Sequence, residues 1–147
     1  MKWAFPIVEL PIEQRDNQNW VYDPVRRDWY VLQKEEEVRQ QLLHFFLSEK
    51  KVPRGLIAVE KEIRYNQMRK RFDVVIYGRD GKPFILCECK APDVPLTPDT
   101  LNQIARYNAV IKAPHLLITN GLYYLFFSQN ANGRYERVPS GWIAEKE

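Results

Sequence analysis

The sequence predicts an α/β domain with a central mixed sheet of about five strands, flanking α-helices and a small β-rich arm at the N-terminus. Short apolar runs with the two-residue period of strands alternate with two longer segments of helical periodicity. The pair Asp80-Gly81 stands between two predicted strands and is typical of a tight hairpin turn. With 147 residues, 45% of them hydrophobic, the chain is long enough to bury one ordinary globular core.

We expect one domain in three parts: an arm over residues 1–33, a core over 34–128 and a mostly polar tail over 129–147. The longest apolar runs fall well short of the roughly 20 residues that cross a bilayer, and the N-terminus lacks the pattern of a secretory leader. Cys87 and Cys89 lie on one face of a predicted strand, where they cannot easily form a disulfide. The sequence therefore predicts a cytoplasmic protein with reduced cysteines and no membrane partner.

The first elements have separate strand and helix signals. In the arm, WVYDPVRRDWYVL gathers aromatic and β-branched residues around a proline, which predicts short strands near 19–22 and 28–32. Residues 34–48 begin with three glutamates in the first turn and continue with an apolar stripe at helical spacing, so they predict an amphipathic helix. The stripe consists of Val38, Leu42, Phe45 and Phe46.

The middle of the chain contains three predicted strands. They cover residues 56–65, 71–77 and 84–90. If Asp80 and Gly81 are the two residues of a type I′ turn, the hairpin register places Asp73 directly opposite Glu88. Two opposed carboxylates destabilise a strand pair, so a stable protein that keeps them together needs a cation nearby. Lys90 shares the strand face of Glu88.

The rest of the core combines a helix with two strands. Thr97 and Pro98 form a favourable helix start, and the helix continues through LNQIARYNAVI. Its expected packing stripe consists of Leu101, Ile104, Ala105, Asn108 and Ile111. HLLIT and LYYLFFS predict two strands around Asn120-Gly121, and a last short strand is expected in the tail.

Basic residues are concentrated just before Asp73. Residues 50–71 contain eight Lys or Arg against two Glu, a local net charge of +6 in a chain whose formal net charge is +3. Such a tract suits the phosphate backbone of a nucleic acid, although a solvated hairpin surface has the same composition. The residues expected to contact the backbone are Arg64, Arg69, Lys70 and Arg71.

Asp73, Glu88 and Lys90 together have the chemistry that phosphodiester hydrolysis requires. Two carboxylates on adjacent strands can hold a hard divalent cation such as Mg²⁺, and the backbone carbonyl of Cys89 can add a neutral oxygen ligand. A lysine on the same face can position or deprotonate the attacking water, or stabilise the charge on the attacked phosphate. The alternative interpretation is an ordinary network of charges on an exposed strand face.

The same residues resemble the signature of the PD-(D/E)XK nuclease superfamily, in which an acidic residue is followed across a hairpin by Glu-x-Lys. More closely, three stretches resemble the N-terminal nuclease domain of the R subunit of type I restriction enzymes. They are EEEVRQQLL, RFDVVIYGRDGKPFILCECKAPDVPLTPDTLNQIARYN and LLITNGLYYLFF. The resemblance covers roughly residues 20–128 and departs from the superfamily pattern at Phe72, where a proline is common.

This resemblance implies a restriction-endonuclease-like core and a DNA endonuclease of a restriction-modification system that depends on Mg²⁺ or Mn²⁺. Asp73 and Glu88 would be the metal ligands and Lys90 the catalytic lysine. Supporting or DNA-contacting roles are implied for Gln103 and Tyr107 in the second helix, and for Glu37 and Arg39 in the first. Arg39 is expected to pair with Glu37 or with a phosphate.

The resemblance also implies partners: DNA, and the motor, specificity or methylation subunits of a restriction complex. The sequence contains no G-x-x-x-x-G-K-[ST] loop, so no ATPase activity is expected of it. A different hypothesis is a non-catalytic module that keeps the fold, binds nucleic acid or docks on a larger restriction or repair complex. A third hypothesis keeps the chemistry and replaces DNA by RNA, since nothing in the sequence specifies a base sequence.

Overall fold

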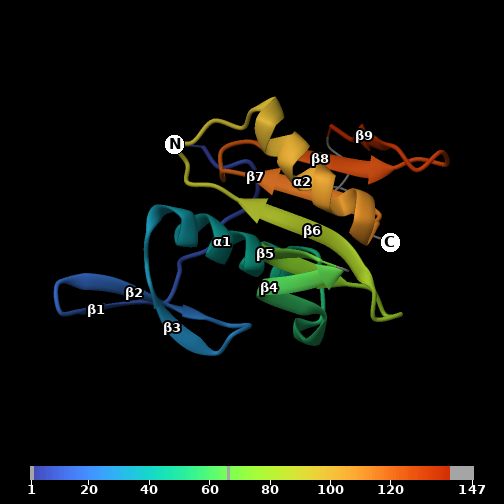
Figure 1. Ribbon diagram of the computed structural model, residues 1–147. Coiled ribbons are helices and arrows are strands. Elements are labelled where there is room, and N and C mark those ends of the chain that lie inside the picture. Colours follow the sequence, from blue (N-terminus) through green and yellow to red (C-terminus); the bar gives the residue numbers. More distant parts are fainter. Residues whose placement is uncertain (1, 66, 140–147) are drawn as a thin grey trace.

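The computed structural model describes residues 2–65 and 67–139, which form a three-stranded sheet, a six-stranded sheet and two α-helices (Figure 1). The small sheet contains β1 (Ile12–Arg15), β2 (Gln18–Asp23) and β3 (Asp28–Val31). The large sheet contains, in spatial order, β4 (Ile57–Tyr65), β5 (Met68–Tyr77), β6 (Pro83–Cys89), β7 (His115–Thr119), β8 (Tyr124–Gln129) and β9 (Tyr135–Arg137). The helices are α1 (Lys34–His44), continued by the π-helical segment η1 (Phe45–Glu49), the 3₁₀ helix η2 (Arg54–Leu56) and α2 (Pro98–Ile111).

The predicted class, a mixed sheet with helices, is confirmed. β6 and β7 run parallel, with α2 between them in the chain, and every other neighbouring pair of the large sheet is antiparallel. The sheet has six strands rather than about five, because the short strand expected in the tail, β9, pairs with β8. No helix in the described part of the chain is long and apolar enough to cross a membrane.

The two helices pack on opposite faces of the large sheet. On one face, the apolar stripe predicted for the first helix is buried against Ile76 of β5, and we name this cluster the α1 core. On the other face, Ile104 of α2 packs with Val75 of β5 in the α2 core. Neighbouring strand residues point to opposite faces, so β5 contributes to both cores. Cys87 and Cys89 are buried free thiols of the α1 core, and burial raises the pKa of both.

The arm contains one strand that the sequence analysis did not predict. β1 is exposed along its whole length. It lacks the alternation of apolar and polar residues by which strands are usually predicted. It forms because Asp16 and Asn17 have φ angles of 51° and 65°, and Arg15 pairs with Gln18, as in a type I′ turn. β2 and β3 occur where short strands are predicted, and in Figure 1 the β1–β2 hairpin extends away from the large sheet.

The turn between β5 and β6 differs from the prediction. A type I′ turn needs a positive φ at both central residues, but Gly81 has one, at 82°, and Asp80 does not. The N–H of Gly81 donates to the carbonyl of Gly78, and the N–H of Gly78 donates to the carbonyl of Lys82, both at 2.9 Å. The prediction of a two-residue turn is therefore wrong, because these bonds close a three-residue loop over 79–81.

The predicted register of β5 and β6 is nevertheless correct beyond the turn. A bulge in the pairing just after the turn compensates for the extra loop residue. Val74 consequently pairs with Cys87, as the predicted register requires. Asp73 precedes Val74 and Glu88 follows Cys87, so both lie one position beyond this last pair.

The segment before β1 packs on the turn between β7 and β8. The N–H of Ala4 donates to the carbonyl of Gly121 at 2.8 Å, and the ring of Trp3 lies against the same glycine. Gly121 has a φ of 92°, and a Cβ atom added to it would lie 2.6 Å from the Trp3 ring. Both the backbone conformation and the close contact therefore require glycine.

We expect Gly121→Ala to lower the free energy of unfolding by about 1–3 kcal/mol, because the added methyl group meets a left-handed backbone and the Trp3 ring. Urea denaturation followed by tryptophan fluorescence measures the change. Gly55→Ala is the matched control, since Gly55 has open space around its Cα and no positive φ. Equal loss of stability in the two variants would contradict this account of the turn.

Candidate active site

Asp73 lies where the pairing of β5 and β6 ends. The last pair before it is Val74 with Cys87, and beyond this pair Asp73 Oδ2 accepts the N–H of Cys89 at 2.7 Å. Asp73 Oδ1 accepts a hydrogen bond from Arg39 Nη1 at 3.0 Å. Burial raises the pKa of Asp73, while the bond from the Cys89 N–H and the charge of Arg39 act against that rise. Asp73 is thus a largely buried carboxylate with both oxygens engaged.

Glu88, the second predicted carboxylate, is only half satisfied. Its Oε2 lies 3.4 Å from Lys70 Nζ, whereas its Oε1 is buried and accepts no hydrogen bond from any described residue. Burial, and then the negative charge of Asp73, raise the pKa of Glu88 from its ordinary 4.5 to about 7. The charge of Asp73 therefore opposes the ionisation of Glu88, and Lys70 provides part of the expected compensating charge.

Lys90 follows the last residue of β6. Its N–H donates to the carbonyl of Thr119 at 2.8 Å, which extends the pairing with β7. Burial raises the pKa of Glu35, Asp73 and Glu88, and the positive charge of Lys90 acts against that rise in all three. The structure thus brings together the three residues that the sequence predicts to be catalytic.

On α1, Glu35 is the acidic residue whose pKa responds to the charges of Asp73 and Lys90, whereas Glu37 makes no described contact with these groups. Partial burial, and then the charge of Asp73, raise the pKa of Glu35. Arg39 pairs with Glu36 at 3.0 Å and with Asp73, so the expected pairing with Glu37 is not found. Helix geometry explains this outcome, because residues three or four positions apart share a face, while residues 37 and 39 point to different sides.

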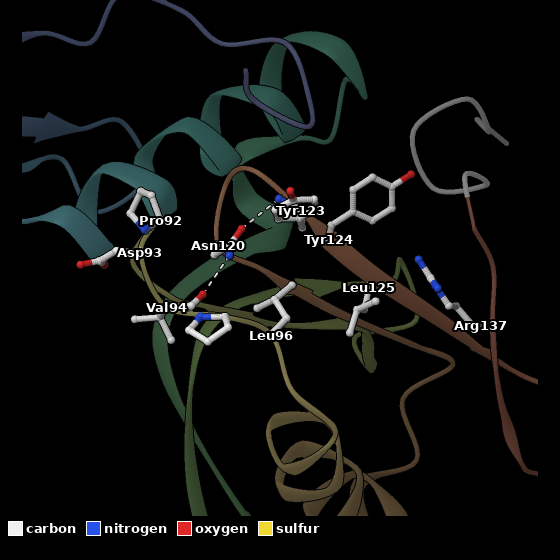
Figure 2. Close-up of a pocket in the computed structure, with 10 residues that line it drawn as sticks. Pro92, Asp93, Val94, Leu96, Asn120, Tyr123, Tyr124, Leu125 and Arg137 are labelled. Carbon is white, nitrogen blue, oxygen red and sulfur yellow. Dashed lines mark hydrogen bonds between the residues drawn. The ribbon is translucent and has the colours of Figure 1, made fainter. Parts of the chain in front are cut away.

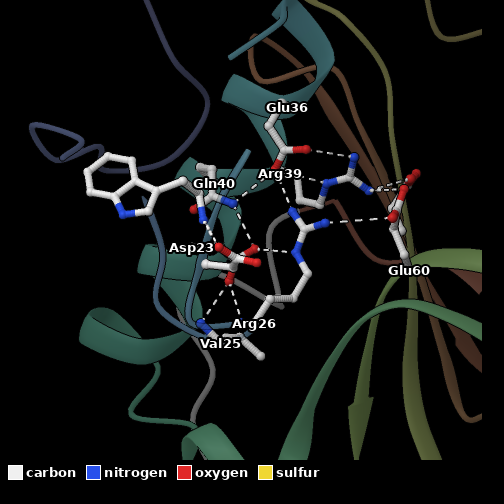
Figure 3. Close-up of polar contacts among 10 residues, drawn as sticks. Asp23, Val25, Arg26, Glu36, Arg39, Gln40 and Glu60 are labelled. Carbon is white, nitrogen blue, oxygen red and sulfur yellow. Dashed lines mark hydrogen bonds and ion pairs between the residues drawn. The ribbon is translucent and has the colours of Figure 1, made fainter. Parts of the chain in front are cut away.

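Arg39 belongs to a network of ion pairs that joins the β2–β3 turn, α1 and β4 (Figure 3). Its Nη2 and Nε donate to Glu36 at 3.0 and 3.3 Å. Glu36 also accepts a bond of 2.9 Å from Arg26, whose Nε donates to Asp23 at 2.7 Å. Gln40 Nε2 donates to Asp23 and to Glu36, both at 2.9 Å. The network therefore connects the candidate site to the N-terminal arm.

The predicted DNA-contacting residues are divided between the two faces of the β4–β5 hairpin. Arg64 pairs with Arg69 across the strands, and both contact Glu62, at 3.2 and 3.6 Å. Arg71 is exposed and shares their face, because it pairs with Glu62 in the ladder. Lys70 lies on the opposite face, with Glu88. The predicted set is therefore a patch of three arginines and one separate lysine.

Gln103 and Tyr107 both lie on α2, as predicted. The side chain of Gln103 is exposed and makes no hydrogen bond to the three candidate catalytic residues, and the side chain of Tyr107 is outside the described part of the structure. The helix start is confirmed, since Thr97 is the N-cap residue and Pro98 the first helical residue. Buried Asn108 fixes the other end of α2 through two hydrogen bonds to the backbone of residue 113.

A pocket of about 630 Å³ lies between the loop after β6 and the turn that joins β7 to β8 (Figure 2). Its walls include Leu96, Tyr123, Tyr124, Leu125 and Arg137. Asn120 holds the rim in place by donating to the carbonyl of Val94 at 2.8 Å and accepting the N–H groups of residues 122 and 123. None of the candidate catalytic residues lines this pocket, so the carboxylates form a separate site.

The oxygen donors of Asp73 and Glu88 fit a hard divalent cation. Glu88 Oε1 accepts no hydrogen bond within the described part of the chain, and Mg²⁺ prefers carboxylate and carbonyl oxygens. The N–H of Cys89 faces Asp73, and the carbonyl of the same strand residue is directed to the same side. Residues 2–65 and 67–139 contain no group of three or more His, Cys, Asp or Glu side chains placed to hold a metal ion. A cation here would therefore need the Cys89 carbonyl and water, which suits Mg²⁺.

We expect Glu88→Gln to raise the free energy of unfolding by about 1–3 kcal/mol at pH 8 in a chelator-treated sample. The folded-state pKa of Glu88 is raised, so the native protein loses stability as pH rises from about 4.5 to about 7, and the amide removes this loss. Urea denaturation at pH 4, 6 and 8 measures the difference. Glu49→Gln is the control, because Glu49 is exposed. We expect it to change the free energy of unfolding little at each of the three pH values. A Glu88→Gln chain no more stable than the native one at pH 8 would contradict the assigned burial.

The comparison with protein families identifies this chain from residue 34 onward. The family described as the type I restriction enzyme R protein N terminus (HSDR_N) matches residues 34–140. The match begins at the first residue of α1 and includes the candidate catalytic residues and α2. None of the curated proteins compared with the chain matches it significantly. Because the match spans well over half of the sequence, the chain belongs to the family of type I restriction enzyme R protein N-termini.

Proposed function

We propose that this chain is a Mg²⁺-dependent DNA endonuclease, which hydrolyses phosphodiester bonds within a restriction-modification system. Its family supports the restriction-modification role, because R proteins are subunits of type I restriction enzymes. From the same membership we infer that its substrate is DNA and that its partners are other subunits of a restriction complex.

The observation that carries the proposal is the state of Glu88. A buried carboxylate oxygen without a hydrogen-bond partner, close to a second carboxylate, is costly unless something positive binds to it. Lys70 approaches the other oxygen of Glu88, so the unpartnered oxygen is the one open to a cation. Perturbed carboxylates next to a lysine at a strand end are typical of catalytic sites. A PD-(D/E)XK-type site is the proposal that accounts for all three residues.

Each residue then has a defined role in hydrolysis. When held by Asp73, Glu88 and the carbonyl of Cys89, Mg²⁺ or Mn²⁺ supplies positive charge that stabilises the reacting phosphate. Lys90 orients the attacking water and donates a hydrogen bond toward the negative charge that develops on the phosphate. The water oxygen bonds to phosphorus, the bond from phosphorus to the 3′ oxygen breaks, and the proton of the water passes through solvent to that oxygen. The products are a 3′-hydroxyl and a 5′-phosphate.

The runner-up function is a non-catalytic module that binds nucleic acid or docks on a restriction complex. The observation in its favour is that both oxygens of Asp73 already have partners within the protein, Arg39 and the N–H of Cys89. In that case Asp73 would be a structural residue and no cation would be required. Cleavage and ion binding by the purified chain distinguish the two functions.

We expect Lys90→Ala and Asp73→Asn each to reduce Mg²⁺-dependent or Mn²⁺-dependent cleavage of supercoiled DNA by about 10²–10³-fold. Lys90→Ala removes the group that orients water, and Asp73→Asn keeps the shape of the side chain while removing its charge. Lys82→Ala is the control, since Lys82 is exposed in the β5–β6 loop. Cleavage by either site variant at the native rate would show that the catalytic assignment is wrong. No cleavage and no calorimetric ion binding by the native chain would favour the non-catalytic module.

We expect the double change Arg69→Gln and Arg71→Gln to weaken DNA binding and to reduce the slope of log affinity against log salt by about 2, if each arginine contacts one phosphate. Fluorescence anisotropy with a labelled duplex at several salt concentrations, in chelator, measures both quantities without cleavage. The control removes two exposed arginines elsewhere, Arg79→Gln and Arg134→Gln. An equal slope in the two double variants would show that the β4–β5 hairpin is not part of the DNA interface.

A further inference from the structure

An unusual backbone conformation lies directly beside the candidate site. Glu60, within β4, has a φ of 51°, a left-handed conformation that non-glycine residues adopt rarely and at a cost. Its position in the ladder is opposite Asp73, because Val59 pairs with Val74 in the neighbouring position. Strain of this kind persists when the surrounding structure imposes it, and it is concentrated at functional sites.

The left-handed residue turns the side chain of Glu60 toward α1. Val59 packs against the α1 core and Ile63 against the α2 core, although regular alternation would place both on one face. The alternation of side chains between the two faces of β4 therefore shifts by one position between Val59 and Ile63, where Glu60 has its positive φ. β5 shifts in the same way around Asp73, because Phe72 packs in the α2 core and Val74 in the α1 core. As a result, the carboxylates of Glu60 and Asp73 both reach Arg39.

Arg39 Nη1 lies within ion-pair distance of both of these carboxylates. It is 3.0 Å from Asp73 Oδ1 and 3.7 Å from Glu60 Oε2, while the other two guanidinium nitrogens of Arg39 are fixed on Glu36. The second oxygen of Glu60 is 3.6 Å from Arg26 Nη1, and the Glu60 side chain is 44% exposed. The distances from Glu60 to Arg26 and to Arg39 are both longer than a hydrogen bond. The carboxylate of Glu60 can therefore still accept a hydrogen bond from either arginine.

We propose that Glu60 is a positioning residue of the cleavage site, which accepts Arg39 Nη1 when Asp73 binds a divalent cation. The inference rests on the proposed function. A cation on Asp73 and the guanidinium of Arg39 repel each other, so Arg39 withdraws, and a buried guanidinium needs a new acceptor. Glu60 Oε2 is 3.7 Å from the same Nη1, while the other two nitrogens of Arg39 are bonded to Glu36.

The charge balance of the network supports the same conclusion. The network contains four carboxylates and two guanidinium groups, which are those of Asp23, Glu36, Glu60, Asp73, Arg26 and Arg39. When all of them are ionised, negative charge is in excess within this group, and Lys70 and Lys90 act on Asp73 from outside it. Glu60 therefore provides the charge that keeps Arg39 paired in both states of the site.

The test compares Glu60→Gln with Glu62→Gln. Both changes remove one negative charge from β4, and the side chains lie on the same face, but Glu62 contacts Arg64 and Arg69 and not Arg39. Calorimetric titration with Mn²⁺ gives the cation affinity of the intact chain without DNA. A second readout is the Mn²⁺ concentration at half-maximal cleavage for native and Glu60→Gln chains, and thermal unfolding in chelator verifies that each variant is folded.

We expect Glu60→Gln to weaken Mn²⁺ binding about tenfold, Glu62→Gln to change it less than about twofold, and saturating Mn²⁺ to restore the cleavage rate of Glu60→Gln. Equal effects of the two variants on Mn²⁺ affinity would overturn the role of Glu60 while leaving the proposed function intact. A cleavage rate that Mn²⁺ does not restore would also overturn it, since it would indicate a direct part in the chemistry or a damaged site. Absence of Mn²⁺ binding by the native chain would overturn both this inference and the metal-dependent function.

Discussion

The guanidinium of Arg39 is the group on which the candidate site depends. Its side chain is 8% exposed, and a charge buried to this extent is tolerated only when its partners neutralise it. Those partners come from α1 and β5, and through Glu36 the network continues to the arm. Loss of one of these partners would leave a buried charge less well neutralised, which is more costly than the loss of a surface ion pair. The helix, the hairpin and the arm are therefore fixed relative to one another by electrostatics as well as by apolar packing.

The two oxygens of Asp73 have a structural role, and the proposed function would give the same oxygens a chemical role as well. Where β5 and β6 stop pairing, its carboxylate accepts a main-chain N–H that would otherwise lack an acceptor. A site of this kind is a compromise, because the interactions that stabilise the free protein are those that a ligand must rearrange.

The sequence was sufficient for the order of the core elements and for the placement of Asp73, Glu88 and Lys90, because apolar periodicity and hairpin register are local properties. The register was correct although the turn was not, since the third loop residue and the bulge cancel each other. β1 was missed because its residues are polar and exposed, and Asp16-Asn17 was the available signal. Spacing along α1 is sufficient to place Glu36 next to Arg39, but it cannot select Arg26 as a partner from a distant turn. The shift of alternation at Glu60 was beyond sequence reasoning, because a glutamate gives no sign of a left-handed backbone.

The small sheet has a consequence for where this domain begins. The family match starts at residue 34, yet Asp23 and Arg26 complete the ion network around Glu36, and Val21 of β2 is fully buried. A protein cut at the start of α1 would keep every candidate catalytic residue and lose the groups that close the first turn of that helix. For recombinant expression, or for transfer of the domain to another protein, these contacts favour a boundary before β2, outside the segment by which the family is recognised.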